Sequence, residues 1–317
     1  MALNGARRVI RASAIAALGL AVNLAAVPAR GAATQPVDDD PAYTAFDAGN
    51  YQTALAEARK AAARGEPAAH TLLGRLYDEG LGIASDPKTA AKWYLKGARL
   101  GDVNAQFALA MLFVRGRGVK KDFVAAGKLF ETAAKAGNAP AQYNLALLYA
   151  NGSGRPADMK KAAKWFAKAA DDDYAPAQYD LGTLYAAGDG VTKSAEKAAL
   201  WTGKAAAAGH VAAQLEYGIM LFKGYGVAKD KDRAAWYLRA AAERGNPVAQ
   251  NRTARLYAYG VVYEPDIVEA AKWHLLARAG GVSDFSLDQY LSRLTPQERQ
   301  AAEDAASKWR ERNLAER

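Results

Sequence analysis

The stretch GNAPAQYNLALLYANGSGRPADMKKAAKWFAKAADD occupies residues 137–172 and decides the fold, because it recurs along the chain every 36 residues. One column of the repeat holds glycine in five copies and aspartate in the fourth copy. A second column always holds alanine, followed by glutamine in every copy except the first, which has His70. Self-similarity at a period between 20 and 50 residues is typical of a solenoid. The two columns are Gly65, Gly101, Gly137, Asp173, Gly209 and Gly245, and Ala69, Ala105, Ala141, Ala177, Ala213 and Ala249.

Each unit is interpreted as two helices joined by a glycine-containing loop. The first helix runs from the Ala-Gln pair to a Leu-aromatic pair, and the glycine that follows suits the positive φ of a helix C-terminus. The second helix begins after a short polar residue that can accept hydrogen bonds from the free amides of the first turn. The stopping glycines are Gly80, Gly116, Gly152, Gly188, Gly224 and Gly260, and the expected N-caps are Asp86, Asp122, Asp158, Ser194, Asp230 and Asp266.

Apolar and small columns predict how the helices pack. Counted from the first residue of a unit, the fifth, ninth and twelfth places share one helical face, which we expect to be buried. The tenth place is always glycine or alanine, which lets neighbouring helices approach closely. A bulky column on the second helix is expected to fill the space between layers, as core rather than as a ligand site. It consists of Trp93, Leu129, Trp165, Trp201, Tyr237 and Trp273.

These motifs resemble the Sel1-like repeat, a relative of the tetratricopeptide repeat (TPR). The shared pattern is Gly-x-x-x-Ala-Gln, then Leu-Tyr, Gly-x-Gly-Val and Ala-Ala-Lys-Trp-Tyr, and it extends from Gly65 to about Gly281. The chain departs from it at Asp173, at Val262 in place of the second loop glycine, and at His70. The resemblance implies an all-α fold, a right-handed α/α solenoid of helix-turn-helix Sel1-like (TPR-like) repeats.

The parts outside the repeats predict export and capping. Residues 1–33 have three arginines near the start, then an apolar run and small residues, which is typical of a secretory signal peptide cleaved near Gly31 to Ala33. We therefore expect a periplasmic or secreted protein. Arg7 and Arg8 leave twin-arginine export open, although an ordinary signal fits better. Residues 34–64 and 282–317 are expected to form helical caps around six repeats at 65–281, and Thr295 with Glu298 predicts a capping box.

Charge and cysteine content narrow the class of protein. The first 33 residues hold four arginines and no acidic residue, so their removal lowers the formal net charge from +9 to +5. The paired lysines lie beside acidic N-caps, which indicates a solvated surface and no nucleic-acid partner. The chain has no cysteine. The fold must therefore rest on packing, and no apolar stretch after the leader is long enough to span a membrane.

Motifs for catalysis are missing from the sequence. His70, His210 and His274 are the only histidines and have no partner at metal-ligand spacing, so no metal and no cofactor is expected. The run Asp171 to Asp173 lacks the alternating ligands of a calcium loop and is interpreted as a turn. No nucleophile elbow or phosphate loop is present. Some cysteine-rich relatives are linked to penicillin binding or β-lactam hydrolysis, but this chain lacks the cysteines that mark that subgroup.

Variable columns on the first helix remain as candidate binding positions. The eighth and fifteenth places lie about 300° and 280° from the fifth on a helical wheel, at the edge of the core arc. We expect them to form a polar stripe on the concave side, suited to a protein or peptide, although plain solvent exposure is the simpler alternative. Tyr225 and Tyr263 add aromatic surface nearby. The candidate stripe is Asn144, Asp180, Glu216, Arg252, Arg115, Asn151, Lys223 and Tyr259.

The sequence therefore predicts an exported, non-catalytic protein-interaction scaffold. The resemblance implies roles such as an envelope regulator that restrains a sensor kinase, or an assembly factor for polysaccharide secretion. One alternative is a hydrolase acting on β-lactam or cell-wall material, which nitrocefin turnover or muropeptide release would reveal. Another is structural oligomerisation through the terminal helices. The partner and the oligomeric state stay open.

Overall fold

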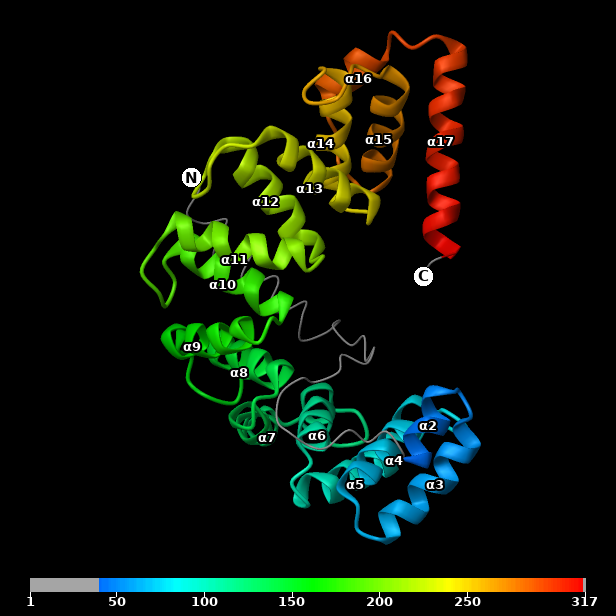
Figure 1. Cartoon of the computed structure of the whole chain (residues 1–317), viewed down its shortest axis with the longest axis vertical. Helices are drawn as coiled ribbons and strands as arrows, with labels where there is room; N and C mark the ends of the chain where they lie inside the picture. The colour runs from blue at the N-terminus through cyan, green and yellow to red at the C-terminus, as the bar shows by residue number, and fades with distance from the viewer. Residues whose placement is uncertain (1–39, 316–317) are drawn as a thin grey trace. The chain divides into compact units, whose positions relative to one another are not determined.

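The computed structural model describes residues 40–315, and this part of the chain contains sixteen helices and no strands, as the repeat pattern predicts (Figure 1). The predicted signal peptide and its cleavage position lie outside the described residues. The chain falls into two compact units, divided between Tyr174 and Ala175. No helix of the described part has both the length and the apolar character needed to cross a membrane.

The first unit contains eight helices in chain order, and each packs against the next. A two-helix cap precedes three helix pairs. In Figure 1, α6 and α8 lie on one side of the unit, and α7 and α9 lie on the other. The helices are α2 (Pro41–Asp47), α3 (Tyr51–Ala63), α4 (Pro67–Glu79), α5 (Pro87–Arg99), α6 (Val103–Arg115), α7 (Phe123–Lys135), α8 (Ala139–Asn151) and α9 (Met159–Asp171).

The second unit repeats this arrangement with three helix pairs followed by two terminal helices. Within it the pairs pack in chain order, and the long last helix packs against α15. The helices are α10 (Ala175–Ala187), α11 (Ala195–Ala207), α12 (Val211–Lys223), α13 (Lys231–Glu243), α14 (Pro247–Ala258), α15 (Ile267–Ala279), α16 (Phe285–Leu291) and α17 (Pro296–Ala315).

Helix ends lie where the capping residues predict them. All six expected N-caps of the second helices accept hydrogen bonds from first-turn amides, for example Ala125 N to Asp122 Oδ1 at 2.9 Å. The stopping glycines have positive φ, for example 69° at Gly116. Asp173 and Val262, which stand in glycine columns, are the non-glycine residues with positive φ in the described chain, at 56° and 76°. The backbone of the repeat is thus kept even where its glycine is lost.

The core contains the fifth, ninth and twelfth places of the first helix, as predicted, and one bulky column on the second helix that differs from the predicted one. Every alanine of the fifth place is at most 1% exposed. The predicted tryptophan column is only half-buried in four of its six copies, and its neighbour at the thirtieth place is buried instead in all six. The predicted bulky core column is therefore wrong by one residue. The twenty-ninth and thirtieth places both lie near the core arc of the second helix, so the wheel does not separate them. The buried column is Tyr94, Phe130, Phe166, Thr202, Leu238 and His274.

Lysines cover the half-buried tryptophans. Lys96 Nζ lies 4.3 Å from the ring centroid of Trp93, and Lys168 and Lys204 lie over Trp165 and Trp201 at 4.5 and 4.4 Å. These lysines follow their tryptophans by three residues, which places them on the same side of the helix. The exposed part of each ring is thus shielded by a cation.

Buried glutamines join successive repeats. The Gln142 amide Nε2 donates to the carbonyl oxygen of Ala134, on the second helix of the preceding repeat, at 3.3 Å. Gln106, Gln214 and Gln250 make the equivalent bond at 3.4, 3.4 and 3.2 Å. A buried amide without a partner would cost free energy. The spacing between repeats is therefore fixed by both packing and hydrogen bonding.

The last helix closes the second unit. Thr295 and Glu298 form the predicted capping box, with Thr295 N to Glu298 Oε2 at 2.8 Å and Glu298 N to Thr295 Oγ1 at 3.3 Å. Trp309 is buried against Trp273, with ring centroids 6.3 Å apart. Its indole Nε1 donates to Glu243 at 2.9 Å. Trp309 therefore covers the last repeat of the second unit.

Replacing Ala141 by leucine tests the packing assignment. The alanine is fully buried within the cluster that includes Phe130 and Leu145, so three added carbons must displace neighbours. We expect the free energy of unfolding to fall by about 1–3 kcal/mol. Urea denaturation followed by circular dichroism measures the change. Ala207→Leu, at an exposed position of α11, should shift stability by less than about 0.5 kcal/mol; equal effects of the two changes would contradict the assignment.

Candidate functional site

The first unit carries three residues of the candidate stripe, and they differ in exposure. Arg115 is exposed at the end of α6 and Asn151 is half-buried at the end of α8. Asn144 is only 8% exposed, and its Nδ2 donates to the carbonyl oxygen of Pro140, one turn earlier, at 2.8 Å. The expectation that Asn144 belongs to an exposed stripe is therefore wrong, because its amide is buried and used within its own helix.

The second unit carries five stripe residues, and four of them are exposed. Glu216 and Lys223 lie on α12, and Arg252 lies on α14. Tyr259, at the end of α14, is 49% exposed, with its ring tilted against Tyr290 at 5.8 Å. Asp180, on α10, is half-buried. The second unit therefore exposes an acidic and a basic residue on α12, and a basic residue and an aromatic ring at α14.

The eleventh place of the repeat carries charged side chains beside this surface in the first and sixth repeats, whereas in the third repeat it holds the buried Leu147. On the helical wheel it lies about 240° from the fifth place, next to the eighth and fifteenth, so the same calculation could have found it. In the first repeat this place holds Arg75, whose Nε lies 2.9 Å from the Glu79 carboxylate. In the sixth repeat it holds Arg255. Charged residues of this column are therefore paired where the structure describes them.

Arg255 anchors the segment after the repeats. Its Nε and Nη2 donate to the two carboxylate oxygens of Asp284 at 2.6 and 2.9 Å, and Asn251 Nδ2 adds a third bond at 3.1 Å. Asp284 also caps α16 through Leu287 N. The Arg255 guanidinium and these further donors hold the pKa of Asp284 well below its usual range. Because both carboxylate oxygens of Asp284 already accept hydrogen bonds, we assign this cluster a structural role and not a binding role.

The sequence predicts that Tyr225 and Tyr263 both add aromatic surface, and the structure exposes one of them and buries the other in part. Tyr225 is exposed, in the loop between α12 and α13. Tyr263 is half-buried and stacks on Tyr257 with centroids 4.6 Å apart. The two predicted surface tyrosines therefore differ, since Tyr263 is held against its neighbour and Tyr225 is open to solvent.

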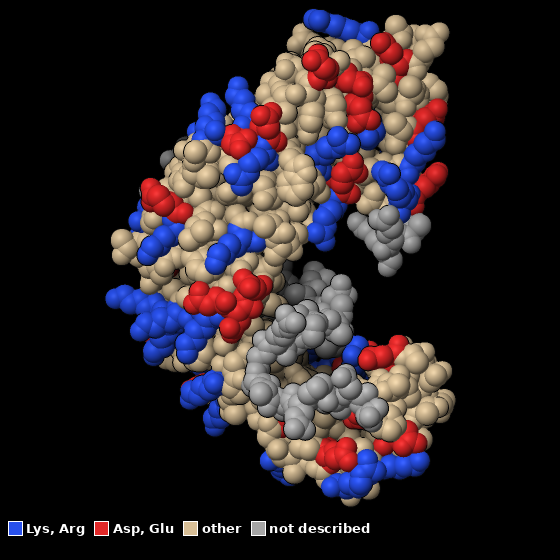
Figure 2. Space-filling view, viewed as in Figure 1, with Lys and Arg blue, Asp and Glu red and all other residues tan. Residues whose placement is uncertain are grey.

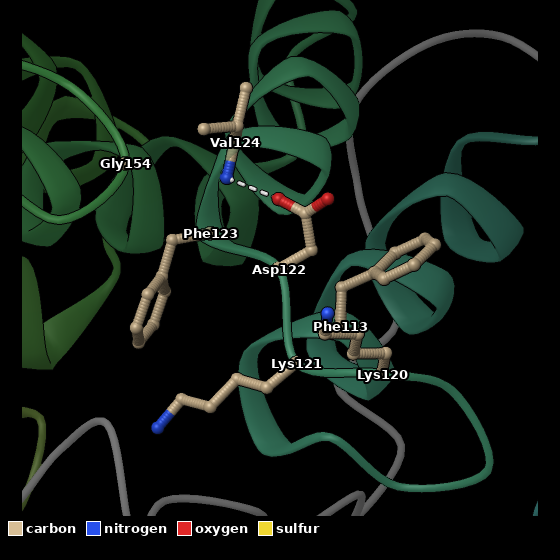
Figure 3. Close-up of a pocket in the computed structure, with 7 residues that line it drawn as sticks. All are labelled: Phe113, Lys120, Lys121, Asp122, Phe123, Val124 and Gly154. Carbon is tan, nitrogen blue, oxygen red and sulfur yellow. Dashed lines mark hydrogen bonds between the residues drawn. The ribbon is translucent and has the colours of Figure 1, made fainter.

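A pocket of about 510 Å³ lies in the first unit, between the loop after α6 and the start of α7 (Figure 3). Asp122 accepts from Val124 N at 2.8 Å and is thus occupied as the N-cap of α7. The amine of Lys121 extends away from Asp122, and its Nζ lies 4.9 Å from the Phe123 ring centroid. The lining combines apolar side chains with two lysines and an aspartate that is engaged as an N-cap. Its lining residues are Phe113, Lys120, Lys121, Asp122, Phe123, Val124 and Gly154.

All three histidines have structural partners. His70 Nδ1 lies 2.8 Å from the carbonyl oxygen of Glu66. His210 accepts from Ala213 N as the N-cap of α12, and burial lowers its pKa. His274 Nε2 lies 2.8 Å from Asp288. Within residues 40–315 no group of histidine, aspartate and glutamate side chains is placed to hold a metal ion.

Charges of both signs are spread over the visible face in Figure 2, with a group of basic residues over α9. That helix exposes Lys160, Lys161, Lys164 and Lys168, of which Lys161 lies 3.4 Å from Asp158 and Lys168 covers Trp165. Two of the four lysines are thus used to stabilise the helix itself.

Comparison with known proteins agrees with this geometry. The Sel1 repeat model matches six consecutive segments, at residues 67–102, 103–138, 139–174, 175–210, 211–246 and 247–282. The chain belongs to the Sel1 repeat family. The division between the two compact units coincides with the boundary between the third and fourth Sel1 repeats.

Two solved structures show the same fold in related chains. A Sel1 repeat protein from Oxalobacter formigenes is 31% identical, with a TM-score of 0.65 over 75% of this chain and 96% of that one. The protein c5321, described as a protective antigen present in uropathogenic Escherichia coli strains, displays this fold at 30% identity, with a TM-score of 0.53 over 84% of this chain and 65% of that one. A comparison with curated proteins found no match. Sel1 repeats generally mediate protein–protein interactions and are typically non-catalytic.

Asp284→Asn tests the structural role of the Arg255 cluster in this Sel1 repeat protein. The Asp284 side chain is 7% exposed, and removing its charge should lower the free energy of unfolding at pH 7 by about 1–2 kcal/mol. Because folding depresses the pKa of Asp284, the stabilisation is present above the unfolded pKa of about 4 and is lost as pH falls from about 5 toward 2. The difference in the free energy of unfolding between the wild type and Asp284→Asn should therefore shrink as the pH falls over this range.

Urea denaturation at a series of pH values measures this difference. Glu303→Gln, at an exposed position of α17, is the matched control and should change little at any pH. A stability loss in Asp284→Asn that stays constant down to pH 2 would show that the ion pair is not its cause.

Proposed function

We propose that this chain is an exported, non-catalytic scaffold that binds a protein or peptide partner through the stripe on its first helices. The observation that carries the proposal is the set of exposed side chains at equivalent places of successive repeats in the second unit, namely Glu216, Lys223, Arg252 and Tyr259. Their backbone is fixed by buried alanines and glutamines. A partner would therefore meet a surface that needs little ordering on binding.

The chemistry of the stripe suits recognition of a protein surface. From α12 to α14 the stripe carries one acidic residue, Glu216, and two basic residues, Lys223 and Arg252, so a partner with complementary charges would be selected in one register. Tyr259 offers an aromatic ring at the end of this row, and tyrosine is enriched among residues that contribute strongly to binding. Asp180 extends the row to α10. No reacting group is needed for this role.

The proposed compartment rests on the sequence before residue 34. Its basic start, apolar run and small residues fit a cleaved leader, which places the mature chain in the periplasm or the medium. There a scaffold of this kind would serve as an envelope regulator or an assembly factor, in sensor-kinase control or in polysaccharide secretion.

Export is tested by the mass of the mature protein. We expect the chain expressed with its own N-terminus to appear in the periplasm or the medium, starting near Gly31 to Ala33. Leu18→Arg, which interrupts the apolar run, should keep the protein in the cytoplasm at full length because the run can no longer insert. Mass spectrometry of each fraction measures the outcome. An uncleaved wild-type chain in the cytoplasm would overturn the proposed compartment.

The binding surface is tested by changing Asp180, Glu216 and Arg252 together to alanine. We expect capture of partners from envelope extract by the mature chain to fall at least about tenfold, which corresponds to about 1.4 kcal/mol. The helical signal and the melting temperature should change little, because Glu216 and Arg252 are exposed. Quantitative mass spectrometry of the captured proteins measures the loss.

A matched control changes Arg299, Glu303 and Glu311 on α17 together to alanine. These residues are exposed, and their replacement alters the net charge by the same amount as the stripe variant. This variant should capture partners like the wild type. Equal capture by the stripe variant and by the control would show that another surface binds the partner.

A further inference from the structure

The second helices of the repeats carry an exposed column that changes character in two neighbouring repeats. At the twenty-eighth place four repeats have lysine, whereas the fourth and fifth have Leu200 and Trp236. These two side chains are 55% and 61% exposed, on α11 and α13. Single exposed apolar residues are common, but tryptophan is rarely left this open to water. The lysines of the column are Lys92, Lys128, Lys164 and Lys272.

Within residues 40–315, Trp236 differs from the other exposed or half-buried tryptophans because no cation lies over its ring. Lysines cover Trp93, Trp165 and Trp201 from three residues further on. The residue three after Trp236 is Arg239, and its Nη1 reaches the Tyr257 hydroxyl at 3.4 Å instead. Trp236 makes an edge-to-face contact with Tyr237, with the two ring centroids 4.7 Å apart. A face of the indole is therefore available to a cation from another molecule.

A pocket of about 580 Å³ lies beside this ring. Within the described chain Asp232 is exposed and has no ion-pair partner, which leaves a free carboxylate in the pocket wall one turn before Trp236. Glu243 adds a second carboxylate, although Trp309 Nε1 at 2.9 Å and the more distant Arg239 and Arg312 at 3.9 Å share it. Arg239 is the basic residue of the lining. The pocket is lined by Asp232, Trp236, Arg239, Ala240, Glu243 and Tyr263.

The loop that lines this pocket differs in sequence from the equivalent loops of earlier repeats. In earlier repeats the second loop glycine lies against the start of the preceding second helix, and a Cβ on Gly226 would overlap the carbonyl group of Ala195. The equivalent residue of the sixth repeat is Val262, whose side chain needs more room. Tyr263, the next residue of this loop, forms one wall of the pocket.

We propose that this pocket binds a lysine or arginine side chain of a partner protein. The cation would lie over the face of Trp236, as lysines of this chain do on its other tryptophans, with the Asp232 carboxylate beside it. The methylene groups of the bound side chain would pack on the apolar atoms of Trp236 and Tyr263. Two carboxylates in the lining disfavour an acidic or phosphorylated segment. This surface is on the second helices and is separate from the stripe of the first helices.

The test uses small probes, so it does not depend on the stripe or on finding a partner. The six indole N–H signals of the full chain are followed by ¹⁵N NMR during titration with N-acetyl-arginine methylamide. N-acetyl-norleucine methylamide is the neutral probe of similar length. We expect the Trp236 signal, assigned by its loss in Trp236→Lys, to shift with saturation in the millimolar range for arginine, with a shift at least about fivefold smaller for norleucine.

Two variants make the test specific. Asp232→Asn should weaken arginine binding roughly two- to fivefold, as expected for loss of one exposed ion pair. Leu200→Lys makes the same kind of change as Trp236→Lys one repeat earlier and should leave the titration unchanged. Trp236→Lys and Leu200→Lys each introduce the lysine that the other four repeats carry at this place, so the fold should be kept. Circular dichroism verifies that it is. Equal shifts with the two probes, equal shifts of all six indoles, or no shift with arginine would overturn the proposal.

Discussion

The buried Ala-Gln pair at the repeat boundaries within each unit is the constraint on which the rest of the structure depends. The alanine has no side chain beyond Cβ, so the helices on both sides of it approach closely, and the glutamine beside it can reach a carbonyl oxygen of the preceding repeat. A larger residue at Ala141 or Ala249 would separate the helices and leave the amide unpaired. Since the pair recurs every 36 residues, surface positions also recur at a constant interval within each unit.

Local features of this fold could be predicted from the sequence because their causes are local. A cap such as Asp122 and a loop glycine such as Gly116 act within one or two turns of their own helix, and both were found where expected. The family and the all-α solenoid follow from the same repetition. Even Asp173 and Val262 could be placed, because their columns fix a backbone conformation that the residues themselves do not favour.

Features that depend on neighbouring elements were harder to predict. The tryptophan column was assigned to the core, yet the adjacent column is buried, because a wheel cannot separate two residues that both border the core arc. Asn144 was expected at the surface, and its bond to Pro140 depends on burial that a wheel does not report. The Arg255–Asp284 pair joins a repeat to the segment after it. No period relates these two positions, so repetition could not suggest the contact.

Departures from the repeat pattern occur in the first repeat and in the last three repeats, and the architecture explains how they are tolerated. Each repeat contacts mainly its neighbours, so a change at an outer position alters one interface and leaves the others intact. Trp236 and Leu200 lie outside the Ala-Gln contacts, and Val262 alters a loop without changing the glutamine bond of Gln250. The stacking that makes the chain regular therefore also isolates its irregular positions. Side chains at these positions can differ between repeats at little cost to the fold, and this freedom lets a repetitive frame present a distinct surface.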